Sequence, residues 1–142
     1  MASILDEARE RAAARRRRQV SIEIPDLEME LICDVPTDGL AVARMQAAAR
    51  KMDRGQAEGV HFARALVANQ VQEIRIGGVT LEVDGAPVNF RDLELQRELQ
   101  ASDGKSAVVA LIGADGDIID VMATLMEAAG LSTDNALEAD PI

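Results

Sequence analysis

The sequence predicts an α+β fold in which two β-hairpins, able to join as one small antiparallel sheet, pack with a bundle of four to five helices. Short runs alternate between apolar and polar residues, longer segments carry apolar residues at helical spacing, and Gly, Pro and Asp separate them. The chain has 142 residues, of which 48% are hydrophobic. A chain of this size can bury a core without disulfides or metals.

The first segment, residues 1–18, is predicted to be a basic helical arm. Ser3 can cap its start, and Asp6 and Glu7 favour the positive end of the helix dipole. The arm ends in four consecutive arginines, Arg15, Arg16, Arg17 and Arg18. Because its apolar residues are mostly alanine, it has little to bury, and we expect an exposed arm that is only partly helical on its own.

A globular domain is predicted over residues 19–130. Residues 20–24 and 27–33 alternate with period two on either side of a Pro-Asp pair, which predicts an antiparallel hairpin. A Gly-Gly pair inside residues 73–83 predicts a second hairpin, and an Asp-Gly pair then turns the chain again.

The same domain contains the predicted helices. They cover about residues 38–53, 56–70, 91–100, 105–112 and 117–129. Asn89 or Asp92 is expected to cap the short helix at about 91–100, and Gly130 is positioned to end the helix at about 117–129. The polar and acidic residues 131–142 are expected to form a flexible tail.

Charge is segregated along the chain, whose formal net charge is −10. Residues 1–18 hold six arginines and three acidic residues, a net charge of +3, so the remainder carries −13. No basic residue follows Lys105. Opposite charges at the two ends permit head-to-tail contact between copies, and we expect self-association.

Few residues in the sequence are suited to catalysis. Cys33 is the only cysteine and His61 the only histidine, which excludes an internal disulfide and a four-ligand Cys/His zinc site. A Cys33–His61 nucleophile pair is conceivable, but Cys33 falls in an apolar strand pattern, where cysteine is usually a packing residue. We therefore predict a protein that is not an enzyme and needs no cofactor.

Two short motifs resemble ligand-binding loops. Gly104-Lys105-Ser106 matches the end of a phosphate-binding loop, but Leu99 stands where that motif needs a second glycine. The acidic stretch at 115–120 lacks the glycine that a calcium loop needs at its sixth position. Both fit helix starts better, so neither a nucleotide nor a metal site is predicted.

Nucleic-acid and membrane binding are both disfavoured. The basic arm can bind phosphates, but the rest of the chain is acidic, and Phe62 and Phe90 are the only aromatic residues available for base stacking. No apolar run approaches the ~20 residues that span a bilayer, and no apolar run follows the N-terminal arginines as in a secretory signal. A reducing, cytoplasmic location is expected.

The candidate partner-binding residues are the four arginines at the end of the arm together with Met122 and Met126. The two methionines lie on the apolar face of the last predicted helix. Such residues usually fill a core, but methionine surfaces also adapt to partners that must be held and released. Both interpretations remain open from the sequence.

Four blocks of sequence form a pattern that covers most of the chain. They are ILDEARERAAARRRR running into VSIEIPDLEMEL, the helix start PTDGL, the hairpin EIRIGGVTLEVDGAPVNFRDLELQRELQ, and LIGADGDIIDVMATLMEAAGLSTD with a closing EADP. Together they resemble the small tail assembly chaperones of long-tailed phages that infect actinobacteria. The pattern is one of blocks and not of a strict motif.

This resemblance implies a non-enzymatic role in the host cytoplasm. Such chaperones hold the long, helical, aggregation-prone tape-measure protein in solution until tail-tube protein polymerises around it, and they are generally absent from the finished virion. The family has no catalytic motif, so no functional residue is carried over. The alternatives are a structural virion protein, such as a head–tail connector or tail-tube accessory protein, and a basic-armed DNA-binding regulator.

Overall fold

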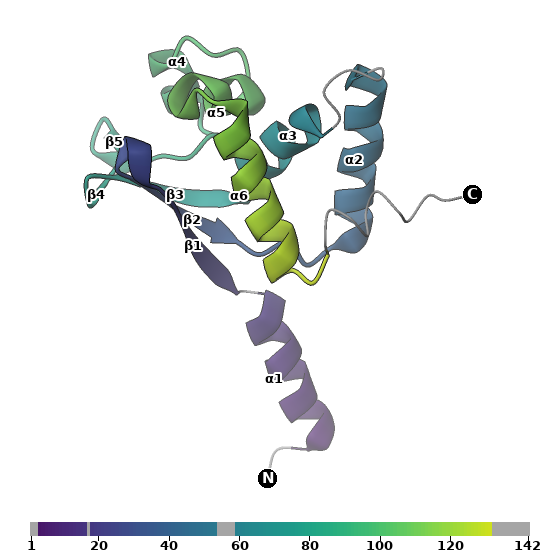
Figure 1. Ribbon diagram of the computed structural model, residues 1–142. Coiled ribbons are helices and arrows are strands. Elements are labelled where there is room, and N and C mark those ends of the chain that lie inside the picture. Colours follow the sequence, from purple (N-terminus) through teal and green to yellow (C-terminus); the bar gives the residue numbers. More distant parts are fainter. Residues whose placement is uncertain (1–2, 17, 54–58, 132–142) are drawn as a thin grey trace.

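The computed structural model describes residues 3–16, 18–53 and 59–131, in which a layer of helices covers one side of an antiparallel sheet (Figure 1). The α+β prediction is confirmed. The strands are β1 (Gln19–Ile24), β2 (Met29–Asp34), β3 (Val71–Ile76), β4 (Val79–Thr80), β5 (Glu82–Val83) and β6 (Ala86–Pro87). The helices are α1 (Ile4–Arg16), α2 (Gly39–Asp53), α3 (Val60–Gln70), α4 (Leu93–Glu98), α5 (Gly104–Ile112) and α6 (Asp115–Ala128).

The two predicted hairpins join into one sheet with the strand order β1-β2-β3-β4. The joint is the antiparallel pairing of β2 with β3, in which Leu31 lies opposite Ile74 and Cys33 opposite Val71. The Gly-Gly turn between β3 and β4 is confirmed, with positive φ angles of 58° and 81° at its two glycines. Strands β5 and β6 form a separate two-stranded sheet, a third hairpin that the sequence predicted only as a turn.

The sheet buries one face, as the alternation in the sequence predicted. Along β2, Met29, Leu31 and Cys33 are buried, and the residues between them are half-buried. Helix α6 lies against β1, and α3 lies against α2, α5 and α6. Phe90, Leu31, Leu66, Ile74, Ile118, Leu125 and Met126 are the largest side chains in this core that are fully buried.

Side-chain caps fix several helix starts. The Ser3 hydroxyl accepts a hydrogen bond from the backbone N–H of Asp6 at 3.0 Å, as predicted. Asp38 likewise accepts from the N–H of Leu40 at 3.1 Å, at the start of α2. Helix α3 is observed from Val60, and the residues before Gly59 where its start was predicted lie outside the described part of the chain.

Asp92 is the N-cap residue of α4, one of the two positions predicted, but its side chain makes no capping hydrogen bond. The Asp92 carboxylate accepts from the backbone N–H of Asn89 at 2.7 Å, and the Asn89 side chain accepts from the N–H of Arg91 at 3.0 Å. Both side chains therefore stabilise the turn before the helix, and neither caps it. Helix α4 is also shorter than predicted, because Gln100 has a positive φ of 55°.

The predicted end of α6 is confirmed. Gly130 has a φ of 77°, its N–H donates to the Glu127 carbonyl at 3.0 Å, and the N–H of Leu131 donates to the Met126 carbonyl at 2.7 Å. This pair of hydrogen bonds is the Schellman motif that glycine favours. From residue 132 onward, the predicted acidic tail lies outside the described residues.

Among the described glycines, Gly104 lies closest to the backbone of another segment. A Cβ atom at this position would lie 3.2 Å from the Phe90 carbonyl oxygen and 3.3 Å from the Cβ of Ala68. The Phe90 carbonyl cannot retreat easily, because it also accepts from the Gln96 side-chain amide at 2.9 Å. Glycine therefore lets the start of α5 pack against the loop before α4.

We expect Gly104→Ala to lower the free energy of unfolding by about 1–3 kcal/mol, because the added methyl group overpacks this contact. Gly116→Ala is the matched control, since a Cβ at Gly116 meets nothing within 4 Å. It should leave stability unchanged or raise it by up to about 1 kcal/mol. Urea unfolding measures both, and equal effects of the two substitutions would contradict the packing argument.

Candidate protein-interaction surfaces

Helix α1 is an arm that stands away from the rest of the molecule (Figure 1). All of its described side chains are exposed except Ala13, which is half-buried, and Ile4 and Leu5 expose 86% and 59% of their surface. The arm joins the body where the Arg18 carbonyl accepts from the N–H of Val35 at 2.9 Å. A helix of this length without packing is marginal in water, so α1 is suited to a partner.

The four arginines predicted to bind partners lie at the root of this arm. Arg15 and Arg18 are exposed and line a recess of about 540 Å³ together with Pro36 and Leu131. Arg17 and the side chain of Arg16 lie outside the described part of the chain. The structure therefore places two of the four arginine side chains, and both are accessible.

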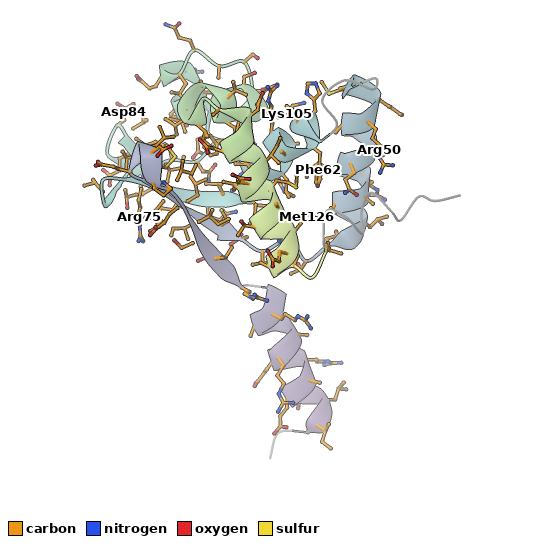
Figure 2. All side chains as sticks on the ribbon, in the orientation of Figure 1. Arg50, Phe62, Arg75, Asp84, Lys105 and Met126 are labelled. Atoms are coloured by element: carbon orange, nitrogen blue, oxygen red, sulfur yellow. The ribbon has the colours of Figure 1, made fainter. Side chains whose placement is uncertain are left out.

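Met122 and Met126 do not lie at the surface. They expose only 6% and 1% of their area and belong to the core beneath α6 (Figure 2). Their helical spacing signalled an apolar face but did not reveal whether other elements cover it. The core interpretation is the one that fits, and neither side chain is available to a partner in this conformation.

The outer face of α2 is a surface that the sequence analysis did not single out. The helix buries Val42 and Ala49, at 5% exposure each, against the body. On the opposite side Leu40 is 62% exposed and continues at helical spacing into Ala43 and Ala47, both exposed. Three exposed cations flank this apolar strip, Arg44, Arg50 and Lys51.

Figure 2 shows Arg50 on the side of α2 away from the sheet. The outer face of α2 is thus basic and rich in alanine, on a chain whose formal net charge is −10. Small side chains allow another helix to approach closely, and the flanking cations favour acidic side chains on that helix.

An acidic groove lies between the end of β1 and the first half of α6. It encloses about 200 Å³, and its apolar wall includes Ile22, Ile24 and Val121, all buried in the core. Four carboxylates line the groove, those of Glu23, Asp26, Asp117 and Asp120. Asp117 is half-buried and the other three are exposed, so the groove is suited to a basic segment that also carries apolar groups.

The outer face of the sheet is polar, and two of its carboxylates share one cation. The Arg75 guanidinium lies between Glu30, at 3.1 Å, and Glu73, at 3.2 Å (Figure 2). The Thr80 hydroxyl donates to Glu73 at 2.6 Å. That hydrogen bond and the neighbouring guanidinium lower the pKa of Glu73. These contacts make the face a less strongly charged target for a partner than the groove.

The Gly104-Lys105-Ser106 motif is a helix start. The Asp103 carboxylate accepts from the backbone N–H of Ser106 at 2.8 Å, so it occupies the position that a phosphate would take at this end of α5. The same hydrogen bond is the main cause of the lowered pKa of Asp103. This geometry supports the structural interpretation of the motif.

The acidic stretch at the start of α6 ties two helices together. Arg64 of α3 donates to both carboxylate oxygens of Asp115, at 2.9 and 3.0 Å. Within residues 3–16, 18–53 and 59–131, no three His, Cys, Asp or Glu side chains are grouped as metal ligands. Asp115 thus has a structural partner in place of the calcium ion considered from sequence.

Cys33 is enclosed in the sheet core. Its side chain is 0% exposed, and its thiol donates to the Leu31 carbonyl at 3.7 Å. Burial, with a smaller contribution from the charge of Asp34, raises the pKa of the thiol to about 12. A protonated, inaccessible thiol is no nucleophile, so the Cys33–His61 pair considered from sequence is not assembled for catalysis.

No family model, curated protein or solved structure matches this chain. In the described part of the chain, no helix combines the length and apolar character needed to cross a membrane. Three surfaces of the molecule are therefore the candidates for function: the arm α1, the outer face of α2 and the acidic groove.

The buried thiol predicts a distinct alkaline transition. Because the ordinary pKa of the thiol is 9.0 and the folded one about 12, the unfolded chain loses this proton first as the pH rises. The contribution of Cys33 to stability is therefore complete below pH 9.0 and is lost toward pH 12. The slope approaches about 1.4 kcal/mol per pH unit.

Urea unfolding at a series of alkaline pH values measures this slope. The chain has no tyrosine, and its two lysines are present in both the native protein and Cys33→Ala, so the difference between the two proteins isolates the thiol. Cys33→Ala should unfold more easily at neutral pH but lack the additional alkaline loss. Identical pH dependence in the two proteins would show that the thiol does not stay protonated in the folded state.

Proposed function

We propose that this protein is a tail assembly chaperone of a long-tailed phage, which binds the tape-measure protein and keeps it soluble during tail assembly. The observation that carries the proposal is the outer face of α2, where an apolar strip on a 15-residue helix faces solvent between cations. The resemblance of the four sequence blocks supplies the identity of the client.

The outer face of α2 suits a long helical client. Leu40 provides an apolar contact at one end, and Ala43 and Ala47 let a second helix lie close along the strip. Arg44 and Lys51 on the same face attract acidic side chains of that helix. One helix face buries less than a permanent interface does, which suits a partner that must later release its client.

The charge of the remaining surface serves the same role. With 25 acidic against 15 basic residues, the chaperone adds net negative charge to each client segment that it covers. Like charges on successive complexes repel one another, which keeps an aggregation-prone client in solution. The basic side chains gathered on the outer face of α2 make that surface one that an acidic client can approach.

The first test is co-expression with the tape-measure protein, encoded by the very long helical reading frame expected nearby. Native protein should keep that client in the soluble fraction, and Leu40→Glu combined with Ala47→Glu should lower the soluble amount about tenfold. Leu93→Glu is the matched control, because Leu93 and Leu40 are both 62% exposed. Equal loss with the control, or none with either variant, would contradict a client site on α2.

The second test separates a chaperone from a structural virion component. Mass spectrometry of purified particles should find tail-tube and tape-measure proteins but not this chain. Detection of several copies per particle would instead support the alternative of a head–tail connector or tail-tube accessory protein.

A further inference from the structure

We infer that helix α1 of one copy docks in the acidic groove between β1 and α6 of a second copy, so that copies associate head to tail. The contact uses neither the outer face of α2 nor a client. It therefore stands or falls separately from the proposed chaperone role.

The arm requires a partner to be stably helical. Its 13 residues form an isolated helix whose described side chains are almost all exposed. Helices shorter than ~12–15 residues are marginal in water unless an apolar face is packed. Ile4 lies at the tip of this arm. At 86%, it is the most exposed large hydrophobic residue in the described part of the chain.

The arm has one face that complements the groove. Ile4, Ala8, Arg11 and Arg15 follow one another at spacings of four, three and four, which places them on one side of the helix. Asp6 lies on the opposite side, and Glu7 flanks this face at a spacing of four from Arg11. This face offers one aliphatic residue, one small residue and two cations in a row.

The groove offers the matching features. Ile22, Ile24 and Val121 provide apolar wall for Ile4 and for the aliphatic stems of the arginines. Asp117 and Asp120, which lie on α6, can accept hydrogen bonds from Arg11 and Arg15, and Asp120 is exposed. Glu23 and Asp26 on the other wall complete a negative surface on both sides of the docked helix.

The arm cannot fill the groove of its own chain. It enters β1 at Gln19, whereas the groove begins at Ile22 and continues to Asp26, beyond the far end of the strand. Six strand residues separate these ends by about 17 Å, and α1 points away from the body (Figure 1). A donor end and an acceptor end on opposite sides give a heterologous contact, which continues from copy to copy.

Sedimentation velocity of the full chain tests the inference. Species larger than a monomer should form as concentration rises at about 0.1 M salt and disappear at about 1 M salt, where the screening length falls from about 10 to 3 Å. Arg11→Glu with Arg15→Glu, and separately Asp117→Lys with Asp120→Lys, should each weaken association by about tenfold or more.

Mixing the two charge-reversed proteins is the decisive measurement. Alone, the first has an acidic arm and an acidic groove, and the second has a basic arm and a groove in which two lysines offset Glu23 and Asp26. In the mixture, the native arm of the second protein meets the native groove of the first, so the two should form a complex that neither forms alone. Glu94→Lys with Glu98→Lys on α4 changes the net charge by the same amount as the groove variant and should associate at least as well as the native protein.

Three results would overturn the inference. The first is a monomer at every concentration at about 0.1 M salt. The second is association that persists in both charge-reversed variants, as edge-to-edge pairing of β1 strands would give. The third is failure of the mixture to form that complex when circular dichroism shows both variants folded. If the arm variant still binds the client, the contact between copies is shown to be independent of the proposed chaperone role.

Discussion

The apolar face of the four-stranded sheet must be kept from water, and the elements that cover it decide what the rest of the molecule exposes. Leu31 and Ile74 face each other across β2 and β3 and are both 0% exposed. Burying side chains of this size stabilises the fold by about 1.5–3 kcal/mol each. Because other helices cover this face, α2 packs mainly on α3 and keeps an outer face, and α1, which precedes an edge strand, lies outside the core.

Local chemistry made most of this fold predictable. The Gly-Gly turn, the Ser3 cap and the Gly130 end of α6 depend on a few neighbouring residues, and all were predicted from them. Strands of two residues, such as β5 and β6, are too short to show a period, so only the turn between them was predictable. The Asn89–Asp92 contact shows the remaining difficulty, since a side chain able to cap a helix can bond to the preceding turn instead.

The interaction surfaces were less predictable than the fold, because they depend on tertiary neighbours. The groove combines Asp26 near β1 with Asp117 on α6, which lie far apart in the sequence. The apolar periodicity of α6 identified Met122 and Met126 correctly as one face, but only the sheet beneath them makes that face core. For α2 the helical spacing was readable, yet the sequence does not say which of its sides α3 covers.

Net charge and local charge act over different distances in this molecule, which is how an acidic chain would bind copies of itself as we infer. At physiological ionic strength the screening length is about 8 Å, so the overall charge of −10 repels a second copy only weakly until surfaces nearly touch. An arginine seated against carboxylates in a groove with an apolar wall is screened much less. Local complementarity can therefore outweigh net repulsion at close range, whereas two acidic bodies without such a contact stay apart. The same separation of ranges would let copies of this chain line up along the client that we propose while remaining in solution.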